Sequence, residues 1–306
     1  LHRVDRRQRQ MCIRDRTRMV SDLGDMLDKT IGVSVSKRNV SGRAYNDGIS
    51  IRGLGGKRVN ILIDGIRVAE AYTGYGRDVV DVELLKRVEI LKGPSSALYG
   101  SDGLAGAVSY ITKDPSDLAE FGQNYFSVNT SYDEDNEQTK VGLLAARVGE
   151  SLESLIQITT RELSQVELHD DANQELDPFD GEQLSVLAKF KLSLSDSVGL
   201  TLTLDSQEFE GDYIFESQAG MSYFPDVVSA SNVLGVDDGN RDRGTLSLDF
   251  SNETSMFDNG SIRFYAQETD QKQITTRKGD RTVSYTQLRA HETLRYLVFR
   301  HQHEKK

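Results

Sequence analysis

The feature that most limits how this chain can fold is a series of segments in which apolar and polar residues alternate. From residue 116 onward, apolar side chains recur at every second position, for example from Leu184 to Leu194 and from Leu200 to Leu204. A period of two is typical of β-strands, because neighbouring side chains point to opposite faces of the sheet. Segments of about ten residues that succeed one another in this way predict an antiparallel meander or barrel.

The connections between these predicted strands are unequal in length. Gly149 to Glu153 and Ser195 to Ser197 are short, whereas Ser164 to Glu182 and Phe209 to Arg243 are long, polar and acidic. Short turns at one end and long loops at the other are typical of an outer-membrane barrel, with its periplasmic turns and extracellular loops. A soluble β-sandwich also alternates, so the pattern favours the membrane barrel and leaves the sandwich open.

Residues 21–115 differ from the strand-rich remainder of the chain and predict a compact α+β unit. Val59 to Val68 is a predicted hairpin whose two-residue turn is Asp64-Gly65, a pair that suits a type I′ turn. Asp81 is expected to cap a short helix over residues 82–87, which leads into a strand at Val88.

The stretch from Lys86 to Pro115 contains two predicted strands, Val88 to Lys92 and Ala107 to Lys113, separated by a segment rich in glycine and serine. So many glycines between two strands predict close backbone approaches and positive φ angles rather than a free linker. Ser95 and Ser96 are expected to cap a helical turn in this segment.

Composition excludes several classes of protein. The net charge of −11 over 306 residues makes nucleic acid an unsuitable partner, because a basic surface is required there. The sequence contains no run of 18 apolar residues, so no transmembrane helix is predicted. The single cysteine, Cys12, excludes intrachain disulfides and cysteine-rich zinc sites.

The two ends of the chain look foreign to the rest. Met11 to Arg16 and Val283 to Thr293 resemble translated library-adapter sequence, and disordered polar arms are the alternative interpretation. Residues 1–20 and 283–306 are therefore predicted to be non-native or disordered. The remaining chain divides into a first domain over 21–115 and a strand-rich domain over 116–282.

Catalytic and metal chemistry is not expected. Gly55-Gly56-Lys57 fails as a phosphate-binding loop, since Ile51 and Arg58 occupy the positions that need Gly and Ser or Thr. Outside the suspect ends the only histidine is His169, so neither a catalytic triad nor a histidine metal site can be assembled. We therefore predict no enzyme, no metal site and no permanently bound cofactor.

With these motifs in view, residues 21–115 resemble the plug domain of TonB-dependent outer-membrane receptors. The resemblance rests on IRGLGGKRVNILIDGIRV (Ile51 to Val68) and ELLKRVEILKGPSSALYGSDGLAGAVSYITKDP (Glu83 to Pro115), and is strongest toward the haem and haemoglobin receptor branch. It implies an α+β plug followed by an incomplete antiparallel transmembrane β-barrel. About seven or eight strands are recognisable, whereas the family barrel has about 22 strands around a plugged lumen.

The resemblance also implies roles for particular residues. Arg52, Arg87 and Glu89 match the charged residues that latch plug to barrel in this family, and surface charges on strand ends are the alternative interpretation. Tyr72 and Tyr75 lie at the expected plug apex, where haem receptors of the family place a histidine. Tyrosine can also ligate haem iron, and His169 in a predicted extracellular loop is a further candidate.

The implied function is energised uptake of an iron-bearing ligand across the bacterial outer membrane, with haem or haem from haemoproteins as the expected cargo. The implied partners are a periplasmic TonB-type energy-coupling protein, the ligand and outer-membrane lipid. A ferric-siderophore or cobalamin receptor of the same family stays open, as does a non-transporting surface-binding barrel. The chain is expected to be part of a longer receptor, because it shows neither a signal peptide nor a TonB-contacting box.

Overall fold

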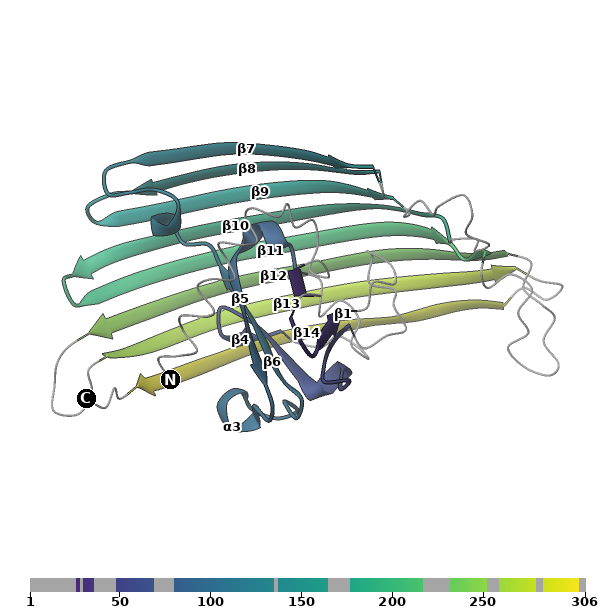
Figure 1. The fold of residues 1–306 in the computed structure, drawn as a ribbon, viewed down its shortest axis with the longest axis horizontal. Coiled ribbons are helices and arrows are strands. Elements are labelled where there is room, and N and C mark those ends of the chain that lie inside the picture. The colour runs from purple at the N-terminus through teal and green to yellow at the C-terminus, as the bar shows by residue number, and fades with distance from the viewer. Residues whose placement is uncertain are drawn as a thin grey trace. The chain divides into compact units, whose positions relative to one another are not determined.

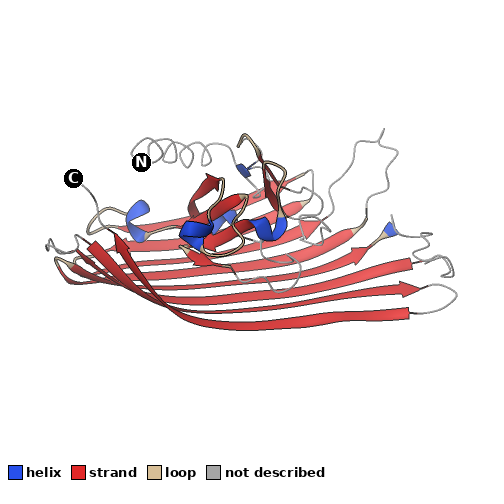
Figure 2. Ribbon diagram, turned by 90° about the horizontal axis from the view of Figure 1, so that it is seen from below, coloured by secondary structure: helices blue, strands red, loops and turns tan. Residues whose placement is uncertain are grey.

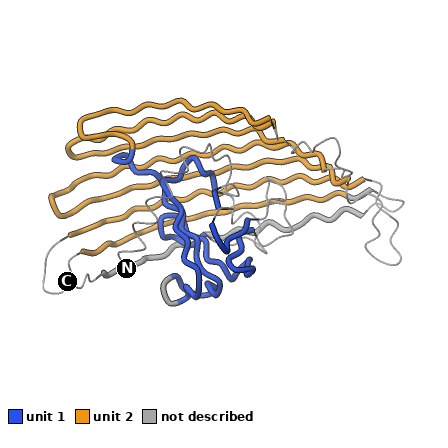
Figure 3. Tube along the Cα trace, in the orientation of Figure 1, with its two compact units in different colours: residues 1–117 blue, residues 118–306 orange. Residues whose placement is uncertain are grey.

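A computed structural model describes residues 26–27, 30–35, 48–68, 80–134, 137–164, 177–216, 232–251, 259–278 and 283–302. Side chains are described within these ranges up to residue 276, except for residues 97–98. The chain divides into two compact units, Leu1–Asp117 and Leu118–Lys306, which Figure 3 colours separately. Each unit is described by itself.

The first unit is built on a four-stranded sheet in the order β4-β3-β6-β5. Its strands are β3 (Val59–Ile63), β4 (Ile66–Arg67), β5 (Leu85–Lys92) and β6 (Gly106–Thr112), with β3 and β6 parallel and the other pairs antiparallel. A separate antiparallel pair joins β1 (Val33–Val35) to β2 (Ile49–Ile51). All five residues of β3 are buried, so this strand lies at the centre of the unit.

The predicted hairpin turn is confirmed. Asp64 and Gly65 connect β3 to β4 with φ angles of 49° and 80°, as a type I′ turn requires. The Asp64 carboxylate also accepts hydrogen bonds from the backbone N–H and the hydroxyl of Thr112, at 2.9 and 2.8 Å. The turn is therefore tied to the end of β6 as well as to its own strands.

The helical segments of the first unit are shorter than predicted. Asp81 does cap, since its Oδ1 accepts the N–H of Glu83 at 2.9 Å. The helix it caps is only the 3₁₀ turn η2 (Val82–Leu84), because β5 pairs with β6 from Leu85 onward and claims the rest of the segment. The other helical pieces are η1 (Gly56–Arg58), α3 (Ser96–Tyr99) and η3 (Pro115–Asp117).

The expectation that Ser95 and Ser96 cap a helical turn is half right. The turn exists as α3, but the Ser95 side chain makes no capping bond. Its hydroxyl instead donates to the Gly103 carbonyl at 3.1 Å, and the residue is fully buried. None of the helices in the described part of the chain is long and apolar enough to cross a membrane.

The close approach predicted for the glycine-rich segment occurs within the first unit itself. A Cβ on Gly106 would lie 2.1 Å from the Leu91 carbonyl oxygen and 2.8 Å from Ile51 Cδ1. Gly106 also has a φ of 152°. Only glycine fits here, because both the space and the backbone angle exclude a side chain.

The second unit is an eight-stranded antiparallel sheet in which each strand pairs with the next along the chain. Figures 1 and 2 show its long strands lying side by side, and the labels of Figure 1 show that they follow the order of the sequence. The strands are β7 (Asn124–Asp133), β8 (Gln138–Val148), β9 (Leu152–Ser164), β10 (Phe179–Ser195), β11 (Val198–Ile214), β12 (Asn232–Ser251), β13 (Asn259–Lys278) and β14 (Val283–Gln302). The predicted meander of strands is confirmed.

Strands β10, β11 and β12 extend into two of the predicted loops. The segment from Phe209 to Arg243 is mostly strand, because β11 continues to Ile214 and pairs with β12 from Leu234 onward. The loop predicted to end at Glu182 likewise gives way to β10 at Phe179. At these strand ends the apolar residues change to the opposite face, for example Phe209 and Tyr213 after Leu200 and Leu204, so the alternation does not continue in phase.

The sheet ends in β14, which occupies the segment for which the sequence predicts a non-native or disordered tail. Its backbone pairs with β13 from Arg277 opposite Val283 to Asn259 opposite Gln302, with one register shift. The segment is therefore a paired strand rather than a disordered tail. The foreign origin of the segment stays a prediction.

The two faces of the sheet have opposite character. On β11, Leu204 is 45% exposed while its neighbours Thr203 and Asp205 are each 6% exposed. The exposed apolar face includes Phe126, Val128, Val141, Leu143, Ile156, Ile158, Leu184, Leu192, Leu194, Leu204, Leu246 and Phe264. The opposite face, here called the polar face, buries Gln157, Thr159, Arg161, Ser185, Lys189, Thr203, Asp205, Gln207, Arg241, Arg243, Thr245, Ser247 and Gln267.

This arrangement is the reverse of a sheet that faces water. On β10, the apolar face runs without interruption from Leu184 to Leu194, which at about 3.3 Å per residue is about 33 Å of strand. A strand tilted by about 40° would span an apolar layer of about 25 Å over that length. Farther along the same face of β11, Glu208, Glu210 and Asp212 come after the apolar run, so the strand continues beyond that layer.

Candidate functional site

The polar face carries a buried ion pair between neighbouring strands. Arg243 on β12 donates through Nε to Asp205 Oδ2 on β11 at 2.6 Å, and the two side chains are 1% and 3% exposed. One step along the strands, Arg241 donates through a terminal nitrogen to Gln207 Oε1, also at 2.6 Å. Charged groups this deeply buried need such partners, and the pairs fix β11 and β12 in register.

A cluster of aromatic and aliphatic side chains interrupts the polar face near the ends of β9 to β12. It consists of Leu163, Phe179, Tyr213, Phe215 and Val233, with Phe209 packed against it. The rings of Phe179 and Tyr213 lie 4.8 Å apart between centroids, and those of Tyr213 and Phe215 are stacked at 5.6 Å. We call these six residues the aromatic cluster.

Two glycines make room for the aromatic cluster. Gly181 on β10 lies directly opposite Gly211 on β11. A Cβ on Gly181 would lie 2.5 Å from the Phe179 ring, and one on Gly211 would lie 2.9 Å from that ring and 3.0 Å from the Phe209 ring. The two rings therefore occupy the space that side chains at 181 and 211 would fill.

The cluster lies at the end of the sheet that carries the longest connections. Residues 165–178 and 215–231 join β9 to β10 and β11 to β12 beside it, whereas the connections at 149–151, 196–197 and 252–258 lie at the opposite end. The predicted asymmetry of the connections is thus present around β9 to β12. The connections at 134–137 and 279–282 are short although they lie at the loop-bearing end.

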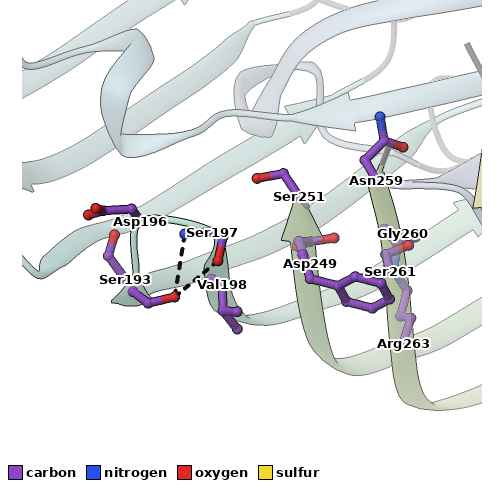
Figure 4. Close-up of a pocket in the computed structure, with 13 residues that line it drawn as sticks. Ser193, Asp196, Ser197, Val198, Asp249, Ser251, Asn259, Gly260, Ser261 and Arg263 are labelled. Atoms are coloured by element: carbon purple, nitrogen blue, oxygen red, sulfur yellow. Dashed lines mark hydrogen bonds between the residues drawn. The ribbon is translucent and has the colours of Figure 1, made fainter. Parts of the chain in front are cut away.

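A polar hollow of about 540 Å³ lies at the end with the short turns. Figure 4 shows Ser193, Asp196 and Ser197 from the β10–β11 turn on one side of it, and Asp249, Ser251 and Arg263 from β12 and β13 on the other. Within the described ranges, no group of three histidine, cysteine or acidic side chains could hold a metal ion. The hollow is lined mainly by hydroxyl and carboxylate groups and offers no apolar surface comparable to the aromatic cluster.

The residues predicted to hold the plug against the barrel are Arg52, Arg87 and Glu89, and they lie at two separate places within the first unit. Arg87 donates through Nε to Glu89 Oε1 at 2.7 Å, and each of the two side chains is about one-third exposed. Arg52 lies after β2 in a turn with a φ of 53°, and its N–H donates to the Gly32 carbonyl at 2.7 Å. Arg87 and Glu89 thus form a pair on one face of β5, and their predicted role toward the barrel stays a prediction.

The predicted ligand-binding residues Tyr72, Tyr75 and His169 lie outside the described residues. The sequence interpretation missed the Arg243–Asp205 pair and the aromatic cluster. Arg243 and Tyr213 fell in a predicted loop, so neither was expected to pair with a neighbouring strand. The alternation of Phe209, Gly211, Tyr213 and Phe215 was the one signal that could have revealed the cluster.

Comparison with known proteins agrees with the two-unit fold. Residues 13–107 match the family model described as the TonB-dependent receptor plug domain. The chain is 27% identical over 291 residues to hemoglobin-binding protein A of Haemophilus influenzae, covering 87% of this chain and 28% of the relative. It is 33% identical over 166 residues to a hemin receptor of Yersinia enterocolitica, covering 54% of this chain and 23% of the relative.

Solved structures share the fold at low sequence identity. The FrpB iron transporter from Neisseria meningitidis superposes with a TM-score of 0.65 at 16% identity, covering 84% of this chain and 42% of that chain. The Serratia marcescens hemophore receptor HasR, solved with its hemophore HasA and heme, gives 0.55 at 17% identity, covering 95% and 58%. The chain spans about a quarter of the length of the curated relatives it matches.

These relatives are transporters and receptors rather than enzymes, and they are β-barrel proteins of the bacterial outer membrane. The sheet of the second unit, with its apolar outer face and buried polar face, has the structure expected of part of such a barrel. Residues 13–107 therefore match the plug domain of TonB-dependent receptors, and the strands after them have the fold of part of a TonB-dependent receptor barrel.

Proposed function

We propose that the receptor carrying this chain takes up haem, free or from haemoproteins, across the outer membrane by TonB-dependent transport. The observation that carries the proposal is the match to hemoglobin-binding protein A of Haemophilus influenzae, because it extends over 87% of this chain and so includes the barrel strands as well as the plug. Similarity confined to the plug would indicate only the transport machinery that the whole family shares.

The loop-bearing end of the sheet is the part of the second unit that suits a haem-sized ligand. The aromatic cluster lies there, on a face that elsewhere buries polar side chains and a few aliphatic ones such as Leu155 and Leu187. Large planar ligands bind to apolar, aromatic-lined surfaces with a few polar groups that orient them. We therefore propose that ligand enters at this end, and that Tyr72, Tyr75 or His169 supplies a ligand to the haem iron.

Energy coupling is the second part of the proposal. A periplasmic TonB-type protein would act on the plug, and Arg52, Arg87 and Glu89 would hold the plug against the barrel until it does. The existing bond between Arg87 and Glu89 supports this role, because the pair is only about one-third exposed and is held on one face of β5. Ion pairs of this kind fix geometry more than they stabilise.

Cobalamin is the second candidate ligand. The vitamin B12 transporter BtuB of Vibrio vulnificus is 39% identical to this chain over 88 residues, although the match covers only 29% of the chain. Such a short match lies within the length of one plug domain. It therefore supports TonB-dependent transport in general and does not distinguish cobalamin from haem as the ligand.

Haem titration of the full-length receptor tests the proposal. We expect a shift of the haem Soret band on binding, and a weaker or altered shift in Tyr75→Phe, Tyr72→Phe or His169→Ala, whichever residue ligates the iron. Uptake of haem by cells that produce the receptor should require the TonB-type partner. Binding of cobalamin without any Soret shift on haem addition would replace the haem proposal with the cobalamin one.

Charge reversal tests the latch separately. Arg87→Glu should lower uptake, and the double variant Arg87→Glu with Glu89→Arg should restore part of it, because it restores a bond between the two positions. Uptake by Arg87→Glu equal to that of the unchanged receptor would refute the latch without affecting the identity of the ligand.

A further inference from the structure

The loop between β5 and β6 is closed at its base and makes few contacts elsewhere. The N–H of Gly93 donates to the Ala105 carbonyl at 2.9 Å, and Lys92 lies opposite Gly106 in the strand ladder. Residues 93–106, which include α3, therefore form a compact loop whose two ends meet. We call this segment the 93–106 loop.

An unpartnered polar side chain lies beneath this loop. Asn60 on β3 is 1% exposed, and within the described residues neither its amide nitrogen nor its amide oxygen has a hydrogen-bond partner. A Cβ on Gly103 would lie 2.6 Å from Asn60 Nδ2 and 2.1 Å from the Ser95 hydroxyl oxygen. Gly103 thus covers Asn60 closely, and the closed loop keeps water from an amide that would be hydrogen-bonded in solvent.

Within the described residues, few interactions hold the loop over Asn60. Ala105 donates to the Arg58 carbonyl at 2.8 Å, whereas the bonds from the N–H and the hydroxyl of Ser95 to the Gly103 carbonyl, at 2.7 and 3.1 Å, lie within the loop itself. Ser96, Gly100, Ser101, Asp102 and Leu104 are exposed. A segment with so few buried groups opens at lower free energy than the sheet on which it lies.

The outer edge of the loop is held by an exposed contact. Arg67 on β4 bonds through one terminal nitrogen to Asp102 Oδ2 at 3.0 Å, and through the other to the carbonyl and hydroxyl of Ser101 at 3.3 Å. Both side chains of the ion pair are more than 40% exposed. This contact can break without unfolding anything beneath it.

We propose that the 93–106 loop is a lid on the plug, held shut by Arg67 and Asp102, which opens in the native protein and admits water to Asn60. The unbonded amide of Asn60 favours opening, and the Arg67 contact opposes it. Gly93 and Gly106, with φ angles of 132° and 152°, mark the two ends at which the backbone would turn. The inference rests on the first unit alone and does not depend on which ligand the receptor carries.

Amide hydrogen exchange on the whole chain folded in detergent micelles tests the lid. The lid amides, of which that of Ala105 is bonded outside the loop, should exchange at least about tenfold faster than those within β6, because the bond from Ala105 to the Arg58 carbonyl lasts only while the loop is closed. Asp102→Asn and Arg67→Gln should speed the lid amides about two- to fivefold, as expected for an exposed ion pair. Exchange within β6 should stay unchanged in both variants.

Two further variants separate the lid from general loosening. Lys86→Gln removes an ion pair with Asp114 and Asp117 elsewhere in the same unit, and should leave the lid amides unchanged. Asn60→Leu replaces the unbonded amide with an apolar group of similar size, and should slow exchange of the lid amides.

Three results would overturn the proposal. Lid amides that exchange as slowly as those of β6 would show that the loop opens only with the whole unit. Equal acceleration of lid exchange by Asp102→Asn and Lys86→Gln would show that the ion pair between Arg67 and Asp102 does not specifically hold the loop closed. Exchange in Asn60→Leu as fast as in the unchanged chain would show that the buried amide does not favour opening. The Asp102 variant alters only an exposed side chain, so the test stands even if Asn60→Leu fails to fold.

Discussion

Single residues on the polar face carry charges that the rest of the sheet must accommodate. Arg243 and Asp205 satisfy each other, and removing one partner leaves the other charge buried. We expect Asp205→Asn to lower the free energy of unfolding by about 3–5 kcal/mol. Urea unfolding of the chain in detergent micelles measures this change.

The same strand pair offers a control for this prediction. Asp242 accepts the Ser206 hydroxyl at 2.6 Å on the opposite, exposed face of β11 and β12. Asp242→Asn should cost less than about 1 kcal/mol, because the asparagine side-chain oxygen can still accept the Ser206 hydroxyl. The double variant Asp205→Leu with Arg243→Met should regain most of the loss, and equal losses in the single variants at 205 and 242 would contradict the burial argument.

A second residue-scale prediction concerns pH and the 93–106 loop. The hydrogen bond from Arg67, helped by that from Ser101, holds the pKa of Asp102 below its ordinary value of 3.8. A lowered pKa means that the contact stabilises the closed loop fully above the ordinary pKa, and that this contribution is lost as the pH falls through the lowered value. Hydrogen exchange of the lid amides, corrected for the intrinsic pH dependence, should therefore show extra opening at acid pH, which Asp102→Asn abolishes.

At the scale of strands, β10 and β11 depend on glycine where aromatic rings cross them. A Cβ at Gly181 would lie 2.5 Å from the Phe179 ring, so Gly181→Ala should force the ring from its place and cost about 1–3 kcal/mol. The thermal unfolding midpoint in detergent measures this. Gly199 on β11 is the matched control, because its nearest heavy atom would lie 4.0 Å away; a loss at 199 as large as that at 181 would refute the ring-clash explanation.

The strands also show how far sequence patterns reach. Alternation of apolar and polar residues located β10 and the first half of β11, since apolar residues such as Leu200 and Leu204 recur there at every second position. It failed for residues 209–243, because Glu210 and Asp212 take the places of apolar residues while Phe209 and Tyr213 lie on the opposite face. Backbone pairing with β12 keeps residues 209–214 extended, and such pairing leaves no hydrophobic pattern in the sequence of a single strand.

At the scale of the whole molecule, the apolar face should behave as a surface in contact with lipid. Leu204→Lys would place a charge within the apolar layer and should cost about 2–4 kcal/mol of folding free energy in lipid vesicles. Glu210→Lys, on the same face of the same strand but opposite Glu182 and so beyond the apolar run that ends at Leu184, should cost about 0–1 kcal/mol. Equal costs at the two positions, or a soluble monomer without detergent, would show that this face is exposed to water.

The plug and the strand-rich unit are recognisable from the order of the residues alone. Two glycine-rich motifs and a run of period-two segments identified a plug followed by barrel strands, because turn chemistry and side-chain alternation are local properties that the residue order records. Asp64-Gly65 and the cap at Asp81 were predictable for the same reason.

Which side chains meet depends on the folded structure. It paired Arg243 with Asp205, gathered the aromatic cluster from four strands, and placed Gly103 over Asn60. The residues of each of these contacts are far apart in the sequence, and their partnership depends on strand register and on space left by glycine, neither of which a single strand's pattern contains. The polar face, rather than the more conspicuous apolar one, is therefore where the fold added most to what the sequence had predicted.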